Sequence, residues 1–334
     1  MKATTRLLAL LTLLGSAGCT HPPIEAARSA PPPSLRREPI EPLIRPDDLE
    51  DDKVALGGRL FHDPILSGDG TVSCATCHDI AAGGDDGLPR SLGIGDAEGT
   101  INAPTVLNAG FNFVQFWDGR AETLEEQAEA PVTHPKEMGA DWAEVVEKVR
   151  ASPRYATEFG RLYSDGVTKD NIVDAIAEFE RMLVTAGGPF DRWLRGDDDA
   201  LSADARAGYE LFQELGCIAC HQGRNVGGNM YQHFGVMSDY FAERGDVTEA
   251  DLGRFNVTGR ESDKHLFRVP SLRMVAHTAP YFHDGTAETL PDAIRVMVRH
   301  QLGREIDDTS VHQLEQFLHS LAGPIPDVEA FRVQ

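Results

Sequence analysis

Apolar residues recur at helical spacing along much of the chain. Two series show this most clearly, one after Thr168 and one after Ser310: Ile172, Ile176, Phe179 and Leu183, then Val311, Leu314, Leu318 and Leu321. Residues spaced three or four positions apart share one face of an α-helix. No segment shows the sustained alternation of a β-strand. The pattern therefore predicts an all-α fold with long loops and little β structure.

The first residues predict export rather than a folded element. In residues 1–19, Lys2 and Arg6 precede a short apolar run, which is typical of a secretory signal peptide and too short to span a bilayer. The segment ends at Cys19 in a sequence that resembles a bacterial lipobox. We expect lipidation of Cys19, and the alternative is ordinary cleavage near Ala17 that leaves a free thiol.

A proline-rich segment separates this signal from the folded part. Residues 20–46 lack helical or strand periodicity and predict an extended, unpacked tether. The acidic run at 47–52 follows, and carboxylates suit the N-terminus of a helix. We therefore expect the first helix to begin there.

Length and charge limit the kind of protein this is. The chain has 334 residues, 41% hydrophobic and 25% charged, which is ordinary for a soluble globular protein and long enough for two domains. Its 31 Lys and Arg residues against 53 Asp and Glu residues give a formal net charge of -22. So acidic a surface repels phosphate backbones and anionic membranes. We expect no nucleic-acid partner, and membrane contact only through a lipid on Cys19.

Four of the five cysteines form two CxxC pairs, each followed at once by a histidine. The residues are Cys74, Cys77 and His78, then Cys217, Cys220 and His221. Two thiols at this spacing can bond both vinyl groups of one haem, and the adjacent histidine then becomes the proximal iron ligand. A four-cysteine zinc site, two redox dithiols and two disulfides are the alternatives. The long separation of the pairs disfavours zinc, a dithiol needs no histidine, and export favours two covalent c-type haems.

The two halves of the chain also repeat each other at an offset of 166 residues. The matching pieces are 116–124 with 282–290 and Pro104 with Pro270, and 57–61 resembles 208–212 ahead of each CxxCH. We infer a duplicated one-haem domain and predict an N-terminal haem domain at 47–195 and a C-terminal one at 196–334, with the boundary in 187–203. A longer glycine-rich stretch at 225–259 predicts a loop that lines a haem or the domain interface.

Several longer stretches resemble the bacterial di-haem cytochrome c peroxidases. They are CATCHDIAAGGDDGLPRSLG, INAPTVLNAGFNFVQFWDGRAETLEEQA, PFDRWLRGD, GCIACHQGRNVGG and TAPYFHDGTAETLPDAIRVM, and the resemblance covers residues 53–322. It implies that His78 is the proximal ligand of a low-potential, peroxidatic haem. His221 and Met297 would be the axial ligands of a high-potential haem at which electrons enter. The related methylamine-dehydrogenase maturation enzyme has Tyr at the position of Met297.

The resemblance also implies roles for three residues near the haems. Glu137 matches the acid/base residue of the family. Peroxide cleavage requires a proton to move from one oxygen to the other, and a desolvated carboxylate can carry that proton. Gln127 matches a residue that lines the same pocket. Trp117 matches a tryptophan between the haems, and a packed aromatic at the domain junction is the alternative for it.

A calcium ion between the domains is implied as well. Asn102 matches its side-chain ligand, and the carbonyl oxygens of Thr278 and Pro280 match its other protein ligands. Such hard oxygen donors, completed by water, are what calcium prefers.

One position departs from the family pattern. Many members have a histidine after the first CxxCH that caps the oxidised peroxidatic iron, and here Ile94 stands in its place. Isoleucine cannot ligate iron, so we predict an open peroxidatic haem that needs no reductive activation. His134 is the residue that could cap the iron instead.

The resemblance implies a periplasmic peroxidase that reduces hydrogen peroxide to water with electrons from a small donor. The acidic surface favours a basic cytochrome c over an acidic copper protein, and family members are commonly homodimers. Two alternatives use the same haems. One is an oxidase that matures a protein substrate, which Met297 argues against, and the other is a plain electron shuttle.

Overall fold

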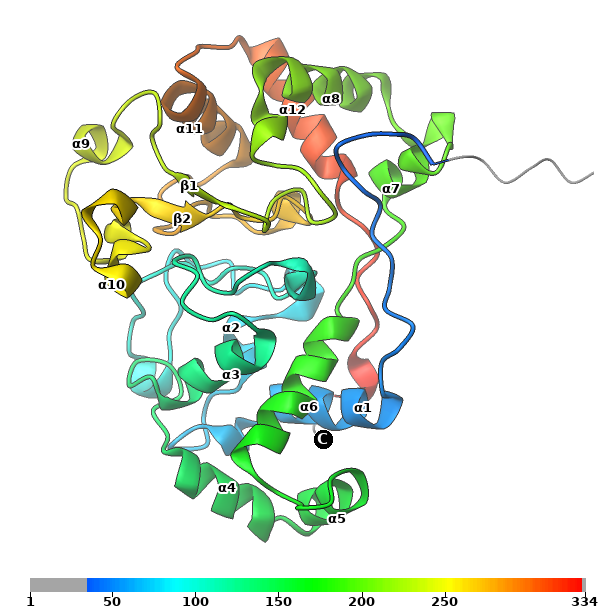
Figure 1. Cartoon of the computed structure of the whole chain (residues 1–334), viewed down its shortest axis with the longest axis vertical. Coiled ribbons are helices and arrows are strands. Elements are labelled where there is room, and N and C mark those ends of the chain that lie inside the picture. Colours follow the sequence, from blue (N-terminus) through cyan, green and yellow to red (C-terminus); the bar gives the residue numbers. More distant parts are fainter. Residues whose placement is uncertain (1–34, 332–334) are drawn as a thin grey trace, which may run out of the picture. The chain divides into compact units, whose positions relative to one another are not determined.

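The computed structural model describes residues 35–331, which belong to one compact unit. The predicted signal peptide, Cys19 and the first part of the predicted tether lie outside the described residues. The described chain is mainly helical, with a single two-stranded sheet, as the hydrophobic pattern predicts (Figure 1). No helix among residues 35–331 is long and apolar enough to cross a membrane.

Six α-helices lie between residues 35 and 183 and form most of the N-terminal half. They are α1 (Asp51–His62), α2 (Cys74–Cys77), α3 (Leu124–Thr133), α4 (Trp142–Ala151), α5 (Pro153–Leu162) and α6 (Lys169–Met182). The predicted start of α1 in the acidic run is confirmed, with Asp51 and Asp52 in its first turn. The predicted helix after Thr168 is α6, and the Thr168 hydroxyl accepts a hydrogen bond from the Asn171 amide.

The C-terminal half contains the remaining helices and the sheet. They are α7 (Pro189–Leu194), α8 (Ala203–Leu215), α9 (Tyr240–Arg244), α10 (Phe255–Thr258), α11 (Leu290–Leu302), α12 (Asp308–Ser320), β1 (Tyr231–His233) and β2 (Leu266–Arg268). The strands are antiparallel, with Gln232 opposite Phe267. The helix predicted around Val311 is α12, which begins two residues before Ser310.

Each half is built around one tight helix crossing. In the N-terminal half α1 packs on α6, and in the C-terminal half α8 packs on α12. A Cβ atom on Gly57 of α1 would lie 1.7 Å from the Ala175 carbonyl oxygen, and one on Gly208 of α8 would lie 1.9 Å from the Gln313 carbonyl oxygen. Only glycine permits so close an approach, so the two halves use the same residue for the same purpose.

The offset of 166 residues also appears in the backbone. Asn108 and Met274 both have a positive φ, of 62° and 65°, and Phe116 and Phe282 have 66° and 71°. Such values are uncommon outside glycine. The same offset relates the isolated bridges Gln115 to Ala121 and Tyr281 to Ala287. The matched segments therefore share an unusual local conformation as well as a sequence.

The two halves meet through a pair of hydrogen bonds related by this repeat. The Asn102 amide donates to the His283 carbonyl at 2.8 Å, and the Arg268 amide donates to the Trp117 carbonyl at 2.8 Å. Positions 102 and 268 correspond under the offset, as do 117 and 283. The contact between the halves is thus built twice from equivalent positions.

The prediction of an unpacked tether is wrong for residues 35–46, the part of it that the structure describes. Ile40 and Leu43 are buried, with exposed fractions of 1% and 0%, and Ile40 packs in the C-terminal core. The Gly223 amide donates to the Pro39 carbonyl at 2.9 Å, and Arg36 donates to the Trp193 carbonyl at 2.7 Å. Proline keeps this segment extended, but its apolar side chains bind it to the C-terminal half.

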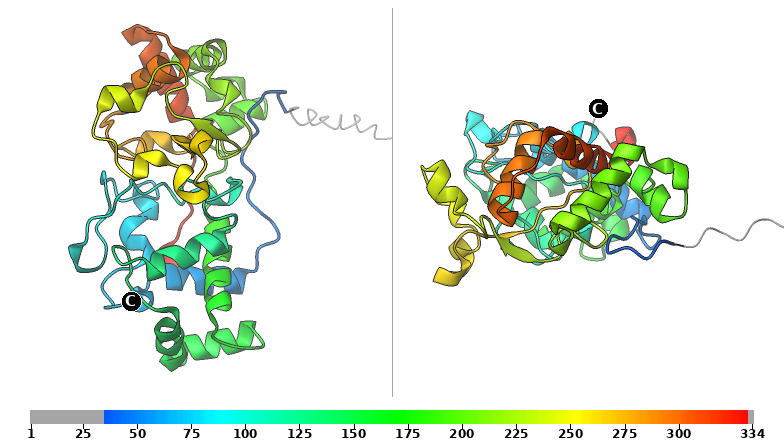
Figure 2. Two further views of the ribbon diagram at one scale, coloured as in Figure 1. Left: turned by 60° about the vertical axis from the view of Figure 1, so that its left-hand side comes forward. Right: turned by 90° about the horizontal axis from the view of Figure 1, so that it is seen from above.

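The end of the chain returns in the opposite direction. In Figure 1 and in the left view of Figure 2, the segment after α12 runs back to the N-terminal half. There Val328 joins the core and Phe331 packs against Gly58 of α1. Helix α7, which the sequence boundary at 195 leaves on the N-terminal side, packs Phe190 and Leu194 into the C-terminal core. The division into two haem domains stays a prediction.

Candidate functional site

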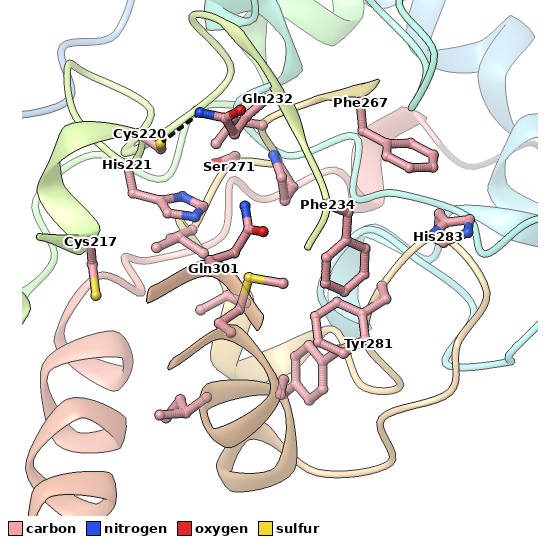
Figure 3. A pocket seen from close by; sticks show the side chains of 18 of the residues that line it. Cys217, Cys220, His221, Gln232, Phe234, Phe267, Ser271, Tyr281, His283 and Gln301 are labelled. Carbon is pink, nitrogen blue, oxygen red and sulfur yellow. Dashed lines mark hydrogen bonds between the residues drawn. The ribbon is translucent and has the colours of Figure 1, made fainter. Parts of the chain in front are cut away.

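The second CxxCH segment lines a cavity of about 430 Å³ in the C-terminal half (Figure 3). Cys217, Cys220 and His221 form one wall, and Met297 of α11 also lines the cavity. Most of the remaining wall is apolar and includes Phe212, Phe234, Phe267, Tyr281, Leu314 and Leu318. Two thiols, an imidazole and a thioether in an apolar cavity fit a covalently attached haem with His and Met as axial ligands.

Both CxxCH histidines are held in the form that an iron ligand needs. His221 Nδ1 donates to the Val226 carbonyl at 3.3 Å, and His78 Nδ1 donates to the Gly84 carbonyl at 3.2 Å. Burial lowers the pKa of His221 to about 4 and also lowers the pKa of His78. Each ring is therefore neutral at pH 7, with the proton on Nδ1 and the lone pair on Nε2 free for a metal.

Glycine makes room for this arrangement beside His221. A Cβ atom on Gly227 would lie 2.2 Å from the Pro270 carbonyl oxygen and 3.3 Å from His221 Nδ1. Gly227 has a φ of 130°, a value that side chains disfavour. It belongs to the stretch 225–259, which is not one long loop as predicted, since it contains β1, α9 and α10. Four of its residues line the cavity: Gln232, His233, Phe234 and Val236.

The four cysteines do not form the alternative sites. All four are free thiols, and they form neither a disulfide nor a metal-ligand cluster among residues 35–331. Burial raises the pKa of Cys74 to about 12 and that of Cys217 to about 11. A reactive redox dithiol needs a lowered thiol pKa, so these surroundings do not suit it.

Glu137 lies in the turn that follows α3. Its carboxylate is 3.3 Å from His134 Nδ1, and its side chain is 42% exposed. Burial raises the pKa of Glu137, although the positive charges of His134 and Arg120 act to lower it. Gln127 lies half-buried on α3, and its side chain makes no hydrogen bond to Glu137 among the described residues. Of these two predicted residues, only Glu137 has a partner that could exchange a proton.

The loop that carries Ile94 packs directly on the Glu137 segment. The Ile94 amide donates to the Glu137 carbonyl at 2.7 Å. A Cβ atom on Gly93 would lie 2.1 Å from the Lys136 carbonyl oxygen, so the two segments touch through backbone. A residue at position 94 is thereby held next to the predicted acid/base residue. His134 pairs with Glu137 here, and its capping of iron stays a prediction.

Trp117 reaches from the N-terminal half to the wall of the C-terminal cavity. Its Nε1 donates to the Asn102 carbonyl at 3.0 Å, and its ring meets the His283 ring edge-on with centroids 6.3 Å apart. The predicted position at the junction of the halves agrees with these contacts.

Three predicted calcium ligands, Asn102, Thr278 and Pro280, lie along the wall of the same cavity. Asn102 Nδ2 donates to the Leu88 carbonyl at 2.9 Å, which directs Oδ1 away from that bond. The Thr278 and Pro280 carbonyls accept no hydrogen bond among the described residues. One amide oxygen and two free carbonyls fit a hard cation that completes its shell with water.

Sequence reasoning missed a charged network beside this cavity. The buried Asp251 carboxylate accepts from His283 Nε2 at 2.7 Å, from Arg244 at 2.6 Å and from the Thr248 amide at 2.6 Å. Burial opposes ionisation, but these hydrogen bonds outweigh it and hold the pKa of Asp251 well below its usual range. Arg244 also pairs with Asp284. In the sequence, the one hint of this network was the repeat, which aligns His283 with Trp117 and so indicates that His283 lies near the junction of the halves.

Comparison with known proteins gives a consistent result. The family model described as di-haem cytochrome c peroxidase matches residues 51–199. Cytochrome c peroxidase Ccp of Escherichia coli (strain K12) is 48% identical over 292 residues, which are 87% of this chain and 62% of that protein. Cytochrome c551 peroxidase of Nitrosomonas europaea is 47% identical over 292 residues, 87% of this chain and 86% of that protein. A solved MauG-like protein associated with microbial copper homeostasis has a TM-score of 0.73 at 26% identity, covering 90% of this chain and 95% of that one.

Proposed function

Because the chain belongs to the di-haem cytochrome c peroxidase family, we propose that it reduces hydrogen peroxide to water with two electrons from a small donor protein. The family implies two c-type haems, which the two CxxCH segments would hold. The observation that carries the proposal is a difference between equivalent helices. At the position where α11 has Met297, the offset of 166 residues places Pro131 on α3. Proline cannot ligate iron, so one haem would have a Met ligand and the other an open face.

The open face would lie on the side where Glu137 stands. The bound haem supplies the iron that takes up peroxide and passes electrons to it. Glu137 would take the proton from one peroxide oxygen and return it to the other as the O–O bond breaks, and two further protons complete two waters. A raised pKa suits a group that must both accept and donate a proton near neutrality.

Electrons would enter at the C-terminal half. A thioether ligand raises the reduction potential of a haem, so Met297 suits an electron-accepting site. Trp117 would fill the space between the two haems, since its ring contacts His283 and its indole nitrogen bonds Asn102. The acidic surface favours a basic cytochrome c as donor over an acidic copper protein.

The proposal includes calcium at Asn102, Thr278 and Pro280. Asn102→Ala removes the only side-chain oxygen of this set. We expect calcium per chain, measured by atomic absorption after dialysis, to fall in this variant and to stay at the parent value in Asn229→Ala, which alters an exposed amide elsewhere. Full retention of calcium by Asn102→Ala contradicts the assignment.

The proposal also places the protein in the periplasm, held through a lipid on Cys19, and as a homodimer. Cys19→Ala should move the protein from the membrane fraction to the soluble fraction. Sedimentation velocity measures the mass, and a species of one chain at micromolar concentration contradicts the dimer.

The central experiment measures peroxide-dependent oxidation of reduced cytochrome c. It compares fully oxidised enzyme with enzyme reduced beforehand by one electron. We expect equal, immediate rates, because neither Ile94 nor Pro131 can close the open face. A lag in the oxidised sample alone would retain the function and identify a capping residue, with His134 the first to replace. Absence of turnover in both samples contradicts the proposal and favours the maturation oxidase or the electron shuttle.

A further inference from the structure

Arg268 of β2 is a buried charge without a counter-ion. Its exposed fraction is 3%, it forms no ion pair with any carboxylate of residues 35–331, and its Nη1 is enclosed with no hydrogen-bond partner. Its Nε donates to the Phe116 carbonyl at 3.0 Å, which is a neutral acceptor. Burial lowers the pKa of Arg268 to about 10, so the group still carries its charge at pH 7.

Arg273 shows how this chain otherwise buries a guanidinium. Its exposed fraction is 1%, and it pairs with the Asp191 carboxylate at 2.9 Å. It also donates to the carbonyls of Arg224 and Glu41. A buried cation is strongly destabilising unless an anion accompanies it. Arg268 has no carboxylate partner such as Asp191 provides for Arg273. We therefore expect its counter-ion to come from outside the described chain.

The cavity that Arg268 lines contains no anion of its own. No Asp or Glu is among its lining residues, and Arg268 is its only Lys or Arg. The facing residue on β1 is Tyr231, and burial raises the pKa of its phenol, which is therefore neutral. The other ionisable side chains of the wall are three histidines, His221, His233 and His283, which bear no negative charge, and the two CxxC cysteines, which would be bonded to the haem.

A haem brings two carboxylates, its propionates, into an otherwise apolar cavity. We propose that Arg268 binds a propionate of the haem attached at Cys217 and Cys220 and fixes it at the boundary between the two halves. The Arg268 amide bonds the Trp117 carbonyl and its Nε bonds the Phe116 carbonyl, so the cation is held by the loop of the opposite half. This inference rests on haem in the cavity and not on peroxide turnover.

The guanidinium would raise the reduction potential of this haem. Reduction removes one positive charge from the iron, and a cation at the propionate compensates for that loss. Arginine suits the task, because its guanidinium keeps its charge on burial and still has N–H donors left while Nε bonds the Phe116 carbonyl. At the corresponding position of the other half stands Asn102, which has no charge.

The test is a spectroelectrochemical titration of the holoprotein without peroxide. We expect Arg268→Gln to increase the ratio of oxidised to reduced C-terminal haem about tenfold at a fixed potential, which is a fall of about 59 mV for one electron. Arg268→Lys keeps the charge and should stay near the parent. Arg299→Gln removes an arginine from the exposed side of α11 and should have no effect. An unchanged potential in Arg268→Gln with full haem content overturns the proposal.

Two measurements on the unaltered sequence cover the case in which the Gln variant does not fold. Redox-difference infrared spectra of protein labelled with ¹⁵N-arginine should show guanidinium bands that change with the C-terminal haem, and their absence overturns the contact. A free anion could occupy the same place. If a propionate is the partner, the reduction potential should not depend on chloride at constant ionic strength. A potential that depends on chloride would show that a free anion binds Arg268 instead, and would overturn the assignment.

Discussion

The crossing of α1 and α6 at Gly57 and the crossing of α8 and α12 at Gly208 give the two halves one scaffold. The positions around the two CxxCH segments nevertheless differ. Leu318 of α12 lines the C-terminal cavity, and Glu180 stands at the corresponding place on α6, five residues after the crossing in each helix. The two halves therefore share a helix crossing but place different side chains beside their CxxCH segments.

The distal side differs in the same way. Helices α3 and α11 both begin after a threonine that caps them, Thr123 and Thr289. Eight residues into each helix the pair is Pro131 and Met297. The half without a methionine at this position has Glu137 in the turn that follows the helix. This difference supports the proposal that the N-terminal half binds peroxide at an open face beside Glu137, while the C-terminal half transfers electrons.

Replacing Glu137 should give the largest change in peroxide turnover among the variants that test this comparison. Glu137→Gln keeps the size of the side chain but cannot carry a proton, so we expect peroxide turnover to fall about 10²- to 10⁴-fold with both haem potentials unchanged. Steady-state oxidation of cytochrome c measures it. Glu98→Gln, on the exposed part of the loop that packs on this segment, is the control and should retain full activity. Equal activity of both variants would falsify the assignment.

Making α3 resemble α11 should give the next largest effect. Pro131→Met places a thioether where the repeat puts Met297, and we expect the oxidised N-terminal haem to become six-coordinate and turnover to fall at least about tenfold. Electronic absorption and the steady-state assay report the two changes. Pro131→Ala alters the backbone without adding a ligand and should keep the spectrum of the parent. A parent-like spectrum in the Met variant shows that the helices present this position differently.

Restoring the family histidine should alter the oxidised state alone. Ile94 is held beside Glu137 by its amide hydrogen bond, so Ile94→His places an imidazole next to the open face. We expect a lag with fully oxidised enzyme and none after one-electron reduction, while the final rate changes less than about threefold. Ile94→Val should show no lag. If fully oxidised Ile94→His enzyme turns over without a lag, then the imidazole at position 94 does not reach the iron.

One buried carboxyl of the N-terminal half, that of Glu180, should affect stability more than turnover. Glu180 is 5% exposed, and burial raises its pKa to about 8. Its protonated form is therefore favoured in the folded state, so the contribution of Glu180 to stability is full below pH 4.5 and is lost as the pH rises through about 8. Glu180→Gln should stabilise the protein at pH 9 by on the order of 1 kcal/mol or more, and little at pH 4.

Urea unfolding at the two pH values measures this difference. Glu144→Gln on the exposed side of α4 is the matched control and should change neither value. If the Glu180 variant gains no stability at pH 9 relative to pH 4, then the carboxyl has a partner, such as a group of the haem, that offsets its burial.

The sequence by itself determined the helical class, the two CxxCH segments and the repeat. These features are short in range, because a helix depends on spacing of three or four residues and thioether attachment depends on cysteines three positions apart. The start of α6 after Thr168 was readable for the same reason. The repeat was readable because the matching segments occur in the same order in both halves.

Only the tertiary structure decided the burial of Ile40, the unpaired state of Arg268 and the contact of Ile94 with Glu137. Each depends on residues far apart in the chain: Ile40 meets Gly223, and Arg268 meets Phe116 and Trp117. Proline content predicts an extended backbone but not whether another segment covers it. A charged side chain requires a counter-ion only when the surrounding chain excludes water from it. That burial depends on residues far apart in the chain, so no local sequence pattern predicts it.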